Sequence, residues 1–224
     1  MKVVISLGGS LLVPDKVDYI YLHKFVDFIR KFVRKNKVVI VTGGGSTARK
    51  YIGALEHEKV DTKMLSWVGI ASTKLNARLV AGLFNIKTEI PNSLNDVKNS
   101  LIKNNIVVCG ALGFMPKMTS DGDSALIAKY IKADFFVNLT NVNGLYDKDP
   151  KINGAKFIPE ISFSDFSRIV NKINYKAGQH FVLDQAAAKI INNAKIKTII
   201  LNGKNLNNFN NFLNKKKFIG TVIK

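Results

Sequence analysis

The chain has few of the residues that build disulfides, metal clusters or histidine-based catalytic sites. Its 224 residues include one cysteine, Cys109, and three histidines. A single cysteine excludes a disulfide within the chain and any metal site made of several cysteines. Cys109 lies in an apolar run, so we expect a buried core thiol. His23, His57 and His180 all lie outside the glycine-rich segments, and we expect them at the surface or in packing contacts.

Long apolar runs are also missing. No stretch approaches the roughly 18 residues that a membrane helix needs, and the N-terminus lacks the pattern of a signal peptide. These absences predict a cytoplasmic protein with no membrane partner. Hydrophobic residues make up 46% of the chain, an ordinary value for a globular protein. The length suffices for one domain with a sizeable core, and we expect a single domain over residues 1–224.

Acidic residues are scarce. There are 16 of them against 34 lysines and arginines, which gives a formal net charge of +18. Such a balance is compatible with binding of nucleic acid, with steering of anionic substrates, or with a bias in composition. The basic residues are spread along the chain, 215–217 is the only tight run, and no nucleic-acid-binding motif accompanies them. We therefore favour a bias in composition and do not expect nucleic acid as a partner.

What the chain does contain is an alternation of short β-branched runs with amphipathic stretches. The pattern predicts strands at 2–7, 38–41, 86–90, 106–109, 135–139, 198–201 and 218–223. It predicts helices at 17–35, 46–58, 63–83, 94–103, 121–131, 162–171, 183–194 and 205–213, with a turn-rich loop at 140–155. Alternating strands and helices indicate an α/β fold, a three-layer sandwich in which helices cover both faces of a largely parallel sheet.

Two glycine turns follow predicted strands, Gly8-Gly9-Ser10 and Gly43-Gly44-Gly45. In a parallel sheet, ligands lie beyond the carboxyl ends of the strands, and glycine lets the backbone approach a phosphate closely. A helix that begins after the second turn adds oriented N–H groups. Ser46 or Thr47 could cap that helix, and Arg49 could add a bidentate phosphate contact. The alternative is that the glycines only form tight turns, but two such turns in one α/β chain favour phosphate binding.

Other phosphate-binding patterns fit less well. The P-loop needs Gly-x-x-x-x-Gly-Lys, which neither turn supplies. Gly43-x-Gly45-x-x-Ala48 matches the dinucleotide fingerprint, but a second strand ending in an acidic residue should then follow the helix. The chain instead passes into another predicted helix, which argues against a nicotinamide cofactor.

Two later segments also carry polar groups suited to a nucleotide site. At 119–124, Thr119 or Ser120 could cap a helix, and Asp121 and Asp123 would point in different directions because they are two positions apart. A plain helix start with acidic residues near its N-terminus is the alternative. In the loop at 140–150, Tyr146 could lie against a purine base and Asp149 could accept a hydrogen bond from it.

Taken in order, these segments resemble the amino-acid kinase family, and within it the UMP kinases of archaeal type. The resemblance rests on the strand and Gly-Gly-Ser opening, Gly-Gly-Gly-x-x-Ala-Arg-Lys-Tyr at 43–51, the helix start at 119–123, and Thr-Asn-Val-Asn-Gly-Leu-Tyr-Asp-Lys-Asp-Pro at 140–150. Ala177-Gly178, the segment 184–191 and Gly-Thr-Val-Ile at 220–223 extend it over nearly the whole chain.

The resemblance implies phosphorylation of UMP to UDP by ATP in pyrimidine nucleotide biosynthesis, with Mg²⁺ and a homo-oligomer, typically a hexamer built as a trimer of dimers. It implies Asp121 and Arg49 as catalytic residues. ATP would be held by Gly9, Ser10, Gly45, Arg49, Thr140, Asn141, Tyr146 and Asp149. UMP would be held by Gly44, Ser66, Phe114, Met115, Pro116, Lys117, Met118, Thr119 and Ser120.

Three departures from the family pattern keep alternatives open. Ser6 stands where many members have lysine, Ser66 where UMP kinases usually have aspartate, and 119–124 differs from the usual helix start. The acceptor could thus be another small anion, such as isopentenyl phosphate or an amino acid. A nucleotide sensor without turnover and a nucleic-acid-binding module are the remaining hypotheses. No pair of carboxylates has a clear metal spacing, so Mg²⁺ follows only from the chemistry.

Overall fold

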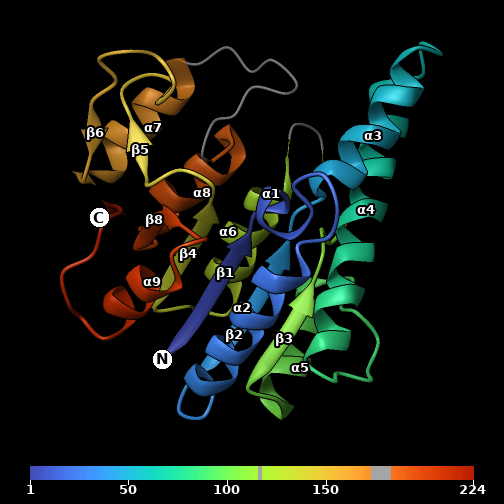
Figure 1. Cartoon of the computed structure of the whole chain (residues 1–224), viewed down its shortest axis with the longest axis horizontal. Coiled ribbons are helices and arrows are strands. Elements are labelled where there is room, and N and C mark those ends of the chain that lie inside the picture. The colour runs from blue at the N-terminus through green and yellow to red at the C-terminus, as the bar shows by residue number, and fades with distance from the viewer. Residues whose placement is uncertain (116–117, 173–182) are drawn as a thin grey trace.

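The computed structural model describes residues 1–115, 118–172 and 183–224. Figure 1 shows a twisted central sheet in which the described strands follow the order β3-β2-β1-β4-β8-β9-β7. These strands are β1 (Lys2–Leu7), β2 (Lys37–Thr42), β3 (Ile106–Cys109), β4 (Phe135–Thr140), β7 (Glu160–Ile161), β8 (Thr198–Asn202) and β9 (Thr221–Ile223). All neighbours pair in parallel except β8 and β9. A short antiparallel pair, β5 (Leu145–Tyr146) and β6 (Phe157–Ile158), lies apart from the sheet.

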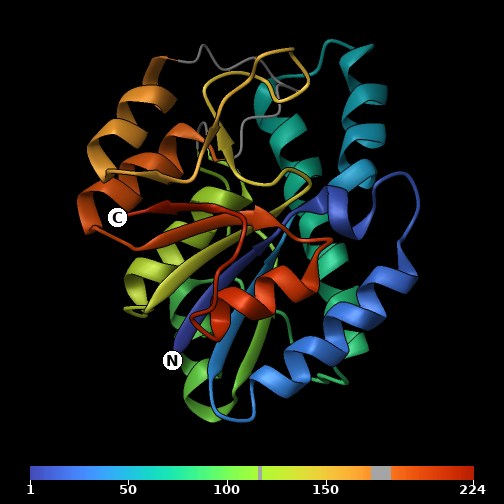
Figure 2. The same ribbon diagram turned by 60° about the vertical axis from the view of Figure 1, so that its left-hand side comes forward.

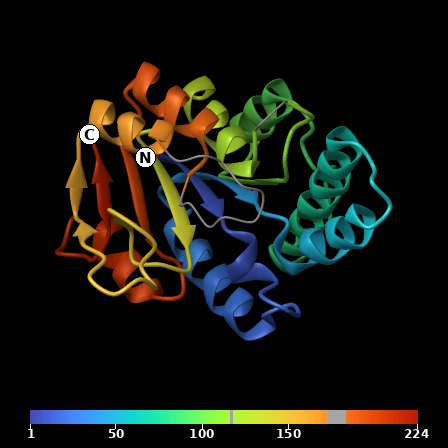
Figure 3. The same ribbon diagram turned by 90° about the horizontal axis from the view of Figure 1, so that it is seen from above.

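Helices cover both faces of the sheet, as predicted (Figure 3). One face carries α2 (Tyr19–Phe32) and α9 (Leu206–Leu213), which meet through the rings of Phe28 and Phe209, 5.2 Å apart. The other face carries α5 (Leu94–Lys103), α6 (Ser120–Tyr130), α7 (Phe163–Lys172) and α8 (Gln185–Ala194). The pair α3 (Gly45–Glu56) and α4 (Thr62–Leu83) stands beside the edge formed by β2 and β3. The three-layer α/β architecture is thereby confirmed.

The register of the strands brings their carboxyl ends to one edge of the sheet. Leu7 pairs with both Thr42 of β2 and Leu139 of β4, and Thr140 pairs with Asn202 of β8. The chain therefore leaves four neighbouring parallel strands at the same level. Both glycine turns and the loop at 140–150 begin there, which is the place where open α/β sheets bind ligands.

Most predicted elements are confirmed, with ends that shift by a few residues. The strand predicted at 86–90 is wrong: this segment is irregular, and β3 forms the edge of the sheet beside β2. The segment has only two apolar residues, and the carbonyl of Thr88 accepts a hydrogen bond from Arg78 on α4. The strand predicted at 218–223 shortens to β9. The one-turn helix α1 (Gly9–Leu12) and the short strands β5, β6 and β7 were not predicted.

The core is made by the β-branched strands and the apolar faces of the helices. Cys109 is fully buried within it, as predicted, and burial raises the pKa of its thiol. His23 and His57 are exposed, and His180 lies outside the described residues. None of the helices in the described part of the chain is long and apolar enough to cross a membrane.

Candidate active site

The two glycine turns pack directly against each other. A Cβ on Gly9 would lie 2.0 Å from the backbone nitrogen of Gly45, and a Cβ on Gly43 would lie 2.5 Å from the nitrogen of Gly9. Gly45 also has a φ of +63°, a conformation that glycine adopts without strain. Residues far apart in sequence thus need glycine because two backbones meet there. The sequence had suggested close approach to a ligand, or a tight turn, as the reason for these glycines.

Helix α4 holds the second glycine turn through side-chain hydrogen bonds. The side-chain amide of Asn76 donates to the carbonyl of Gly43 at 2.7 Å and to that of Gly44 at 3.1 Å. The Thr42 hydroxyl donates to the carbonyl of Thr73, at 2.8 Å, and thereby ties the end of β2 to the same helix. Sequence reasoning missed Asn76, because a polar residue inside a long helix looks like a surface position until its partner is known.

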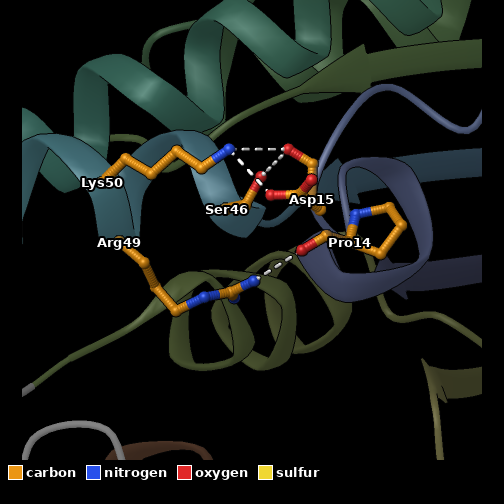
Figure 4. Close-up of polar contacts among 5 residues, drawn as sticks. All are labelled: Pro14, Asp15, Ser46, Arg49 and Lys50. Carbon is orange, nitrogen blue, oxygen red and sulfur yellow. Dashed lines mark hydrogen bonds and ion pairs between the residues drawn. The ribbon is translucent and has the colours of Figure 1, made fainter.

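The start of α3 differs from the expectation. The sequence offers Ser46 or Thr47 as a cap, but the helix begins at Gly45, and its N-cap residue, Gly44, has no side chain to cap with. The Ser46 hydroxyl instead donates to the carbonyl of Asp15, at 2.8 Å (Figure 4). The helix starts earlier than predicted because its first turn is fastened to the loop after α1, where Ser46 also donates its backbone N–H to Val13.

Arg49 lies on the exposed side of α3 and reaches the same loop. One guanidinium nitrogen donates to the carbonyl of Pro14, at 3.0 Å (Figure 4). The neighbouring Lys50 forms an ion pair of 2.8 Å with Asp15. Because arginine has several N–H donors, this single contact leaves others for an anion at the glycine turns. Arg49 therefore holds the loop after α1 through one of its nitrogens.

A partly buried carboxylate, Asp121, is hydrogen-bonded to β1 two residues before the first glycine turn. Asp121 is in the first turn of α6, where its backbone N–H donates to the side chain of the predicted N-cap residue, Thr119. The Ser6 hydroxyl on β1 donates to Asp121 Oδ1 at 2.6 Å. Burial raises the pKa of Asp121 to about 7, and the Asp184 carboxylate adds to the rise, whereas the bond from Ser6 lowers it. Asp121 is thus poised between its charged and neutral forms near neutral pH.

Asp123 turns another way, as predicted from its spacing. Its side chain is 3% exposed and accepts a hydrogen bond from the Leu112 backbone in the loop after β3. Burial raises the pKa of Asp123 to about 7; the Leu112 bond lowers it, Asp184 raises it, and Lys74 on α4 lowers it. Asp123 therefore fastens a loop that leads into the predicted acceptor segment, and it does not contact Ser6.

Asp184 joins α8 to the start of α6. It caps α8 by accepting from the Ala187 N–H at 2.6 Å, and its other oxygen accepts from the Thr119 N–H at 3.1 Å and hydroxyl at 2.5 Å. Sequence reasoning did not select it as a site residue. Its place before a helical segment is a common signal for a cap, but only the fold reveals the second partner.

The residues expected on the ATP side lie at the ends of β1, β2 and β4 and in the loop that follows β4. Gly9 and Ser10 begin α1, Gly45 begins α3, and Thr140 ends β4 next to Asn141. Tyr146 lies on β5 with its ring 5.5 Å from that of Phe157. Asp149 accepts from the Lys151 N–H in an exposed loop. The described structure places no two of these loop side chains in contact with each other except Thr140 and Asn141.

The described residues expected on the UMP side come from the end of β2, from α4, from the segment after β3 and from the start of α6. Ser66 is on α4 and donates to the carbonyl of Thr62 in its own helix, at 2.8 Å. The Phe114 ring stacks on Trp67 of the same helix, with 6.3 Å between centroids. Gly44 precedes α3, Met115 is exposed, Met118 precedes the cap Thr119, and Ser120 begins α6. Pro116, Lys117, Ala177 and Gly178 lie outside the described residues.

The known proteins that this chain resembles belong to one family. The model of the amino acid kinase family matches residues 1–202. A uridylate kinase from Methanothrix thermoacetophila is 36% identical over 211 residues, which are 93% of each chain. One from Sulfolobus acidocaldarius is 33% identical and covers 100% of this chain and 99% of its own length. The crystal structure of uridylate kinase from Archaeoglobus fulgidus superposes with a TM-score of 0.84 at 33% identity, over 100% of both chains.

Proposed function

Because the chain belongs to the amino acid kinase family, we propose that its activity is the phosphorylation of UMP by ATP. The structural observation that carries the proposal is the contact between the two glycine turns, together with the Asp121 carboxylate that Ser6 holds at the end of β1. Relatives that match this chain over nearly their whole length are uridylate kinases. Phosphoryl transfer needs positioning and neutralisation of charge more than covalent chemistry, which suits a site of backbone amides and few titratable groups.

The acceptor explains why no histidine is needed. The attacking group of UMP is a phosphate oxygen that is already ionised near neutral pH, so no general base has to remove a proton. The main barrier is the repulsion between the donor and acceptor phosphates. Backbone N–H groups at Gly9, Ser10 and Gly45, together with the guanidinium of Arg49, would offset that repulsion on the donor side.

Donor and acceptor would occupy different parts of the sheet edge. We place the adenosine of ATP beyond β4, against Thr140, Asn141, Tyr146 and Asp149. UMP would lie between α4 and α6, against Gly44, Ser66 and the segment 114–120. Asp121 is held by Ser6 between these two regions and would orient the groups that surround the transferred phosphoryl. Both halves would then belong to one domain that spans the chain.

The residues present are compatible with Mg²⁺. No group of three histidine, cysteine or carboxylate side chains in the described part of the chain is placed to hold a metal by itself. Mg²⁺ in kinases needs only one or two carboxylates, since substrate phosphates supply the other ligands. Asp121, whose carboxylate is close enough to Asp184 to be repelled by it, is the group that a cation would favour. When bound, Mg²⁺ would neutralise charge on the phosphate oxygens.

We further propose a homo-oligomer, a hexamer built as a trimer of dimers. Helices α3 and α4 support it because they expose several large apolar side chains: Tyr51, Met64, Trp67 and Leu75. Light scattering coupled to size-exclusion chromatography measures the mass of the particle directly. A monomer at micromolar concentration would rule out this assembly while leaving the proposed reaction untouched.

The proposed reaction is tested by following ADP release with ATP and a panel of acceptors. The panel contains UMP, CMP, isopentenyl phosphate and glutamate at equal concentrations. We expect UMP to give the highest kcat/KM. Faster turnover with a non-nucleotide would reject UMP as the acceptor, and tight ATP binding without turnover of any acceptor would indicate a sensor. Ser66, which offers a single hydroxyl where the family usually has a carboxylate, is the position that makes this comparison necessary.

A further inference from the structure

Among the described residues, Arg49 is the one cationic side chain assigned so far to the donor phosphates. The ionisable side chains in the first turn of α6, which packs against β1, are acidic, Asp121 and Asp123, and Ser6 on β1 carries no charge. Arg49 and Lys50 both hold the loop at 13–16. Donor and acceptor phosphates would bring further negative charge into this region, and transfer requires cations to offset it.

The turn after β8 brings a lysine to this edge. Asn202, the last residue of β8, is level with Thr140, which follows the residue level with Leu7. Gly203 then donates its N–H to the carbonyl of Thr140, at 2.8 Å. Lys204 follows at once. The end of β8 is separated from the end of β1 only by β4, roughly 10 Å for two strand spacings.

The turn after β8 also contacts α1, which brings it closer to the first glycine turn than the strand spacing alone would. A Cβ on Gly203 would lie 2.4 Å from Leu11 Cδ1 and 3.0 Å from Leu139 Cβ, so the turn is pressed against the helix that begins at Gly9. Figure 2 shows β8 directed towards α1 before the chain turns back into α9. A side chain in place of Gly203 would push this turn away from α1. Glycine here keeps Lys204 close to the first glycine turn.

The backbone of Lys204 is fixed, whereas its side chain is free. The Lys204 N–H donates to Asn202 Oδ1 at 3.0 Å, and the Asn202 amide donates to Asn143 Oδ1 at 3.3 Å. The residue is exposed, and its ammonium contacts no carboxylate or carbonyl within the described ranges. A flexible four-carbon stem lets such an ammonium cross about one strand spacing.

We propose that Lys204 is a further catalytic residue, whose ammonium contacts the terminal phosphates of ATP above the first glycine turn. This role rests on the proposed function, because it needs ATP to be bound with its phosphates at Gly9 and Ser10. Lys204 adds a positive charge at the end of β8, whereas Ser6 on β1 is uncharged and adds none. It holds no proton that the reaction consumes, and no bond to it forms or breaks.

The test compares Lys204→Met and Lys204→Arg with Lys197→Met. Lys197 precedes the same strand at its other end, where its ammonium lies over the ring of Phe135, 5.5 Å from the centroid. Lys197→Met therefore removes the same charge far from the turns. We expect Lys204→Met to lower kcat/KM for ATP by about 10- to 100-fold, Lys204→Arg by about threefold or less, and Lys197→Met by less than about twofold.

A binding measurement separates a phosphate contact from a structural effect. Calorimetry with ATP and with AMP should show weaker ATP binding in Lys204→Met and unchanged AMP binding, since AMP lacks the terminal phosphates. Equal loss for both nucleotides, loss in Lys204→Arg as large as in Lys204→Met, or wild-type behaviour of Lys204→Met would overturn the role. If the wild type binds ATP but does not phosphorylate UMP, the proposed reaction fails, and the comparison of ATP with AMP still decides the role of Lys204.

Discussion

The Ser6 hydroxyl donates a hydrogen bond of 2.6 Å to the Asp121 carboxylate, across 115 positions of sequence. Ser6 is 1% exposed and lies on β1, two residues before the first glycine turn. The uncharged hydroxyl of Ser6 thus holds the carboxylate of Asp121 in place. The ionised form of Asp121 is stabilised by this bond, against burial and the repulsion from Asp184.

Replacing Ser6 by alanine should therefore shift the pH dependence of the reaction. Without this bond the pKa of Asp121 rises further, so a higher pH is needed to ionise the carboxyl. If ionised Asp121 is required, the acidic limb of the kcat profile moves to higher pH by about 1 unit. Ser6→Thr keeps the hydroxyl and serves as the control. Superimposable profiles for Ser6→Ala and the wild type would show that the bond does not tune the acid.

Asp123→Asn should stabilise the protein above neutral pH. The pKa of Asp123 is raised to about 7 in the fold, so folding favours the neutral acid. Below pH 4 the group is protonated in both states and imposes no penalty; stability then falls as the pH rises to about 7 and stays low above it. The variant removes this loss and should gain roughly 2 to 4 kcal/mol at pH 8. Urea unfolding at pH 4, 6 and 8 measures it, and a gain that is equal at all three values would contradict the assignment.

Alanine in place of Gly9 should disrupt the site, and alanine in place of Gly53 should not. The Cβ at position 9 would meet the backbone of the second turn at 2.0 Å, whereas the Cβ at Gly53 meets nothing within 4 Å. Gly53 lies inside α3, where alanine is expected to add about 0.5 to 1 kcal/mol of stability. Thermal unfolding compares the two variants. A folded Gly9→Ala protein with normal turnover would disprove the packing argument.

Arg49→Ala should weaken the binding of ATP more than Lys50→Ala does. Both side chains hold the loop after α1, but only the guanidinium retains donors for a bidentate phosphate contact. We expect KM for ATP to rise about tenfold in Arg49→Ala and less than about threefold in Lys50→Ala. Similar values in both variants would assign Arg49 to the loop alone.

Ser66→Asp should improve the use of UMP. A carboxylate can accept from two ribose hydroxyls, whereas the Ser66 hydroxyl already donates to the carbonyl of Thr62 within α4. We expect KM for UMP to fall about tenfold, with KM for ATP unchanged, and Ser66→Asn to give an intermediate value. Steady-state kinetics with both substrates varied measures the effect. An unchanged KM for UMP would place Ser66 outside the acceptor site.

Local patterns in the sequence were enough for most strands and helices, for a cap at Thr119 or Ser120 and for the different directions of Asp121 and Asp123. These features depend on a residue and its neighbours within a few positions, where the periods of helix and strand apply. The same local reasoning failed at 86–90, which is irregular and leaves β3 as the edge strand of the described sheet, and at Ser46, whose hydroxyl bonds to Asp15 and caps no helix.

Contacts between distant segments were decided only by the tertiary structure. The two glycine turns meet, Asn76 holds the second of them, Asp184 joins α8 to α6, and Ser6 reaches Asp121. The contact between the glycine turns depends on β1 lying beside β2, and the order of strands in a sheet is not a property of any short window of sequence. A hydrogen bond needs its partner within about 3 Å, and only the packed layers bring such partners together.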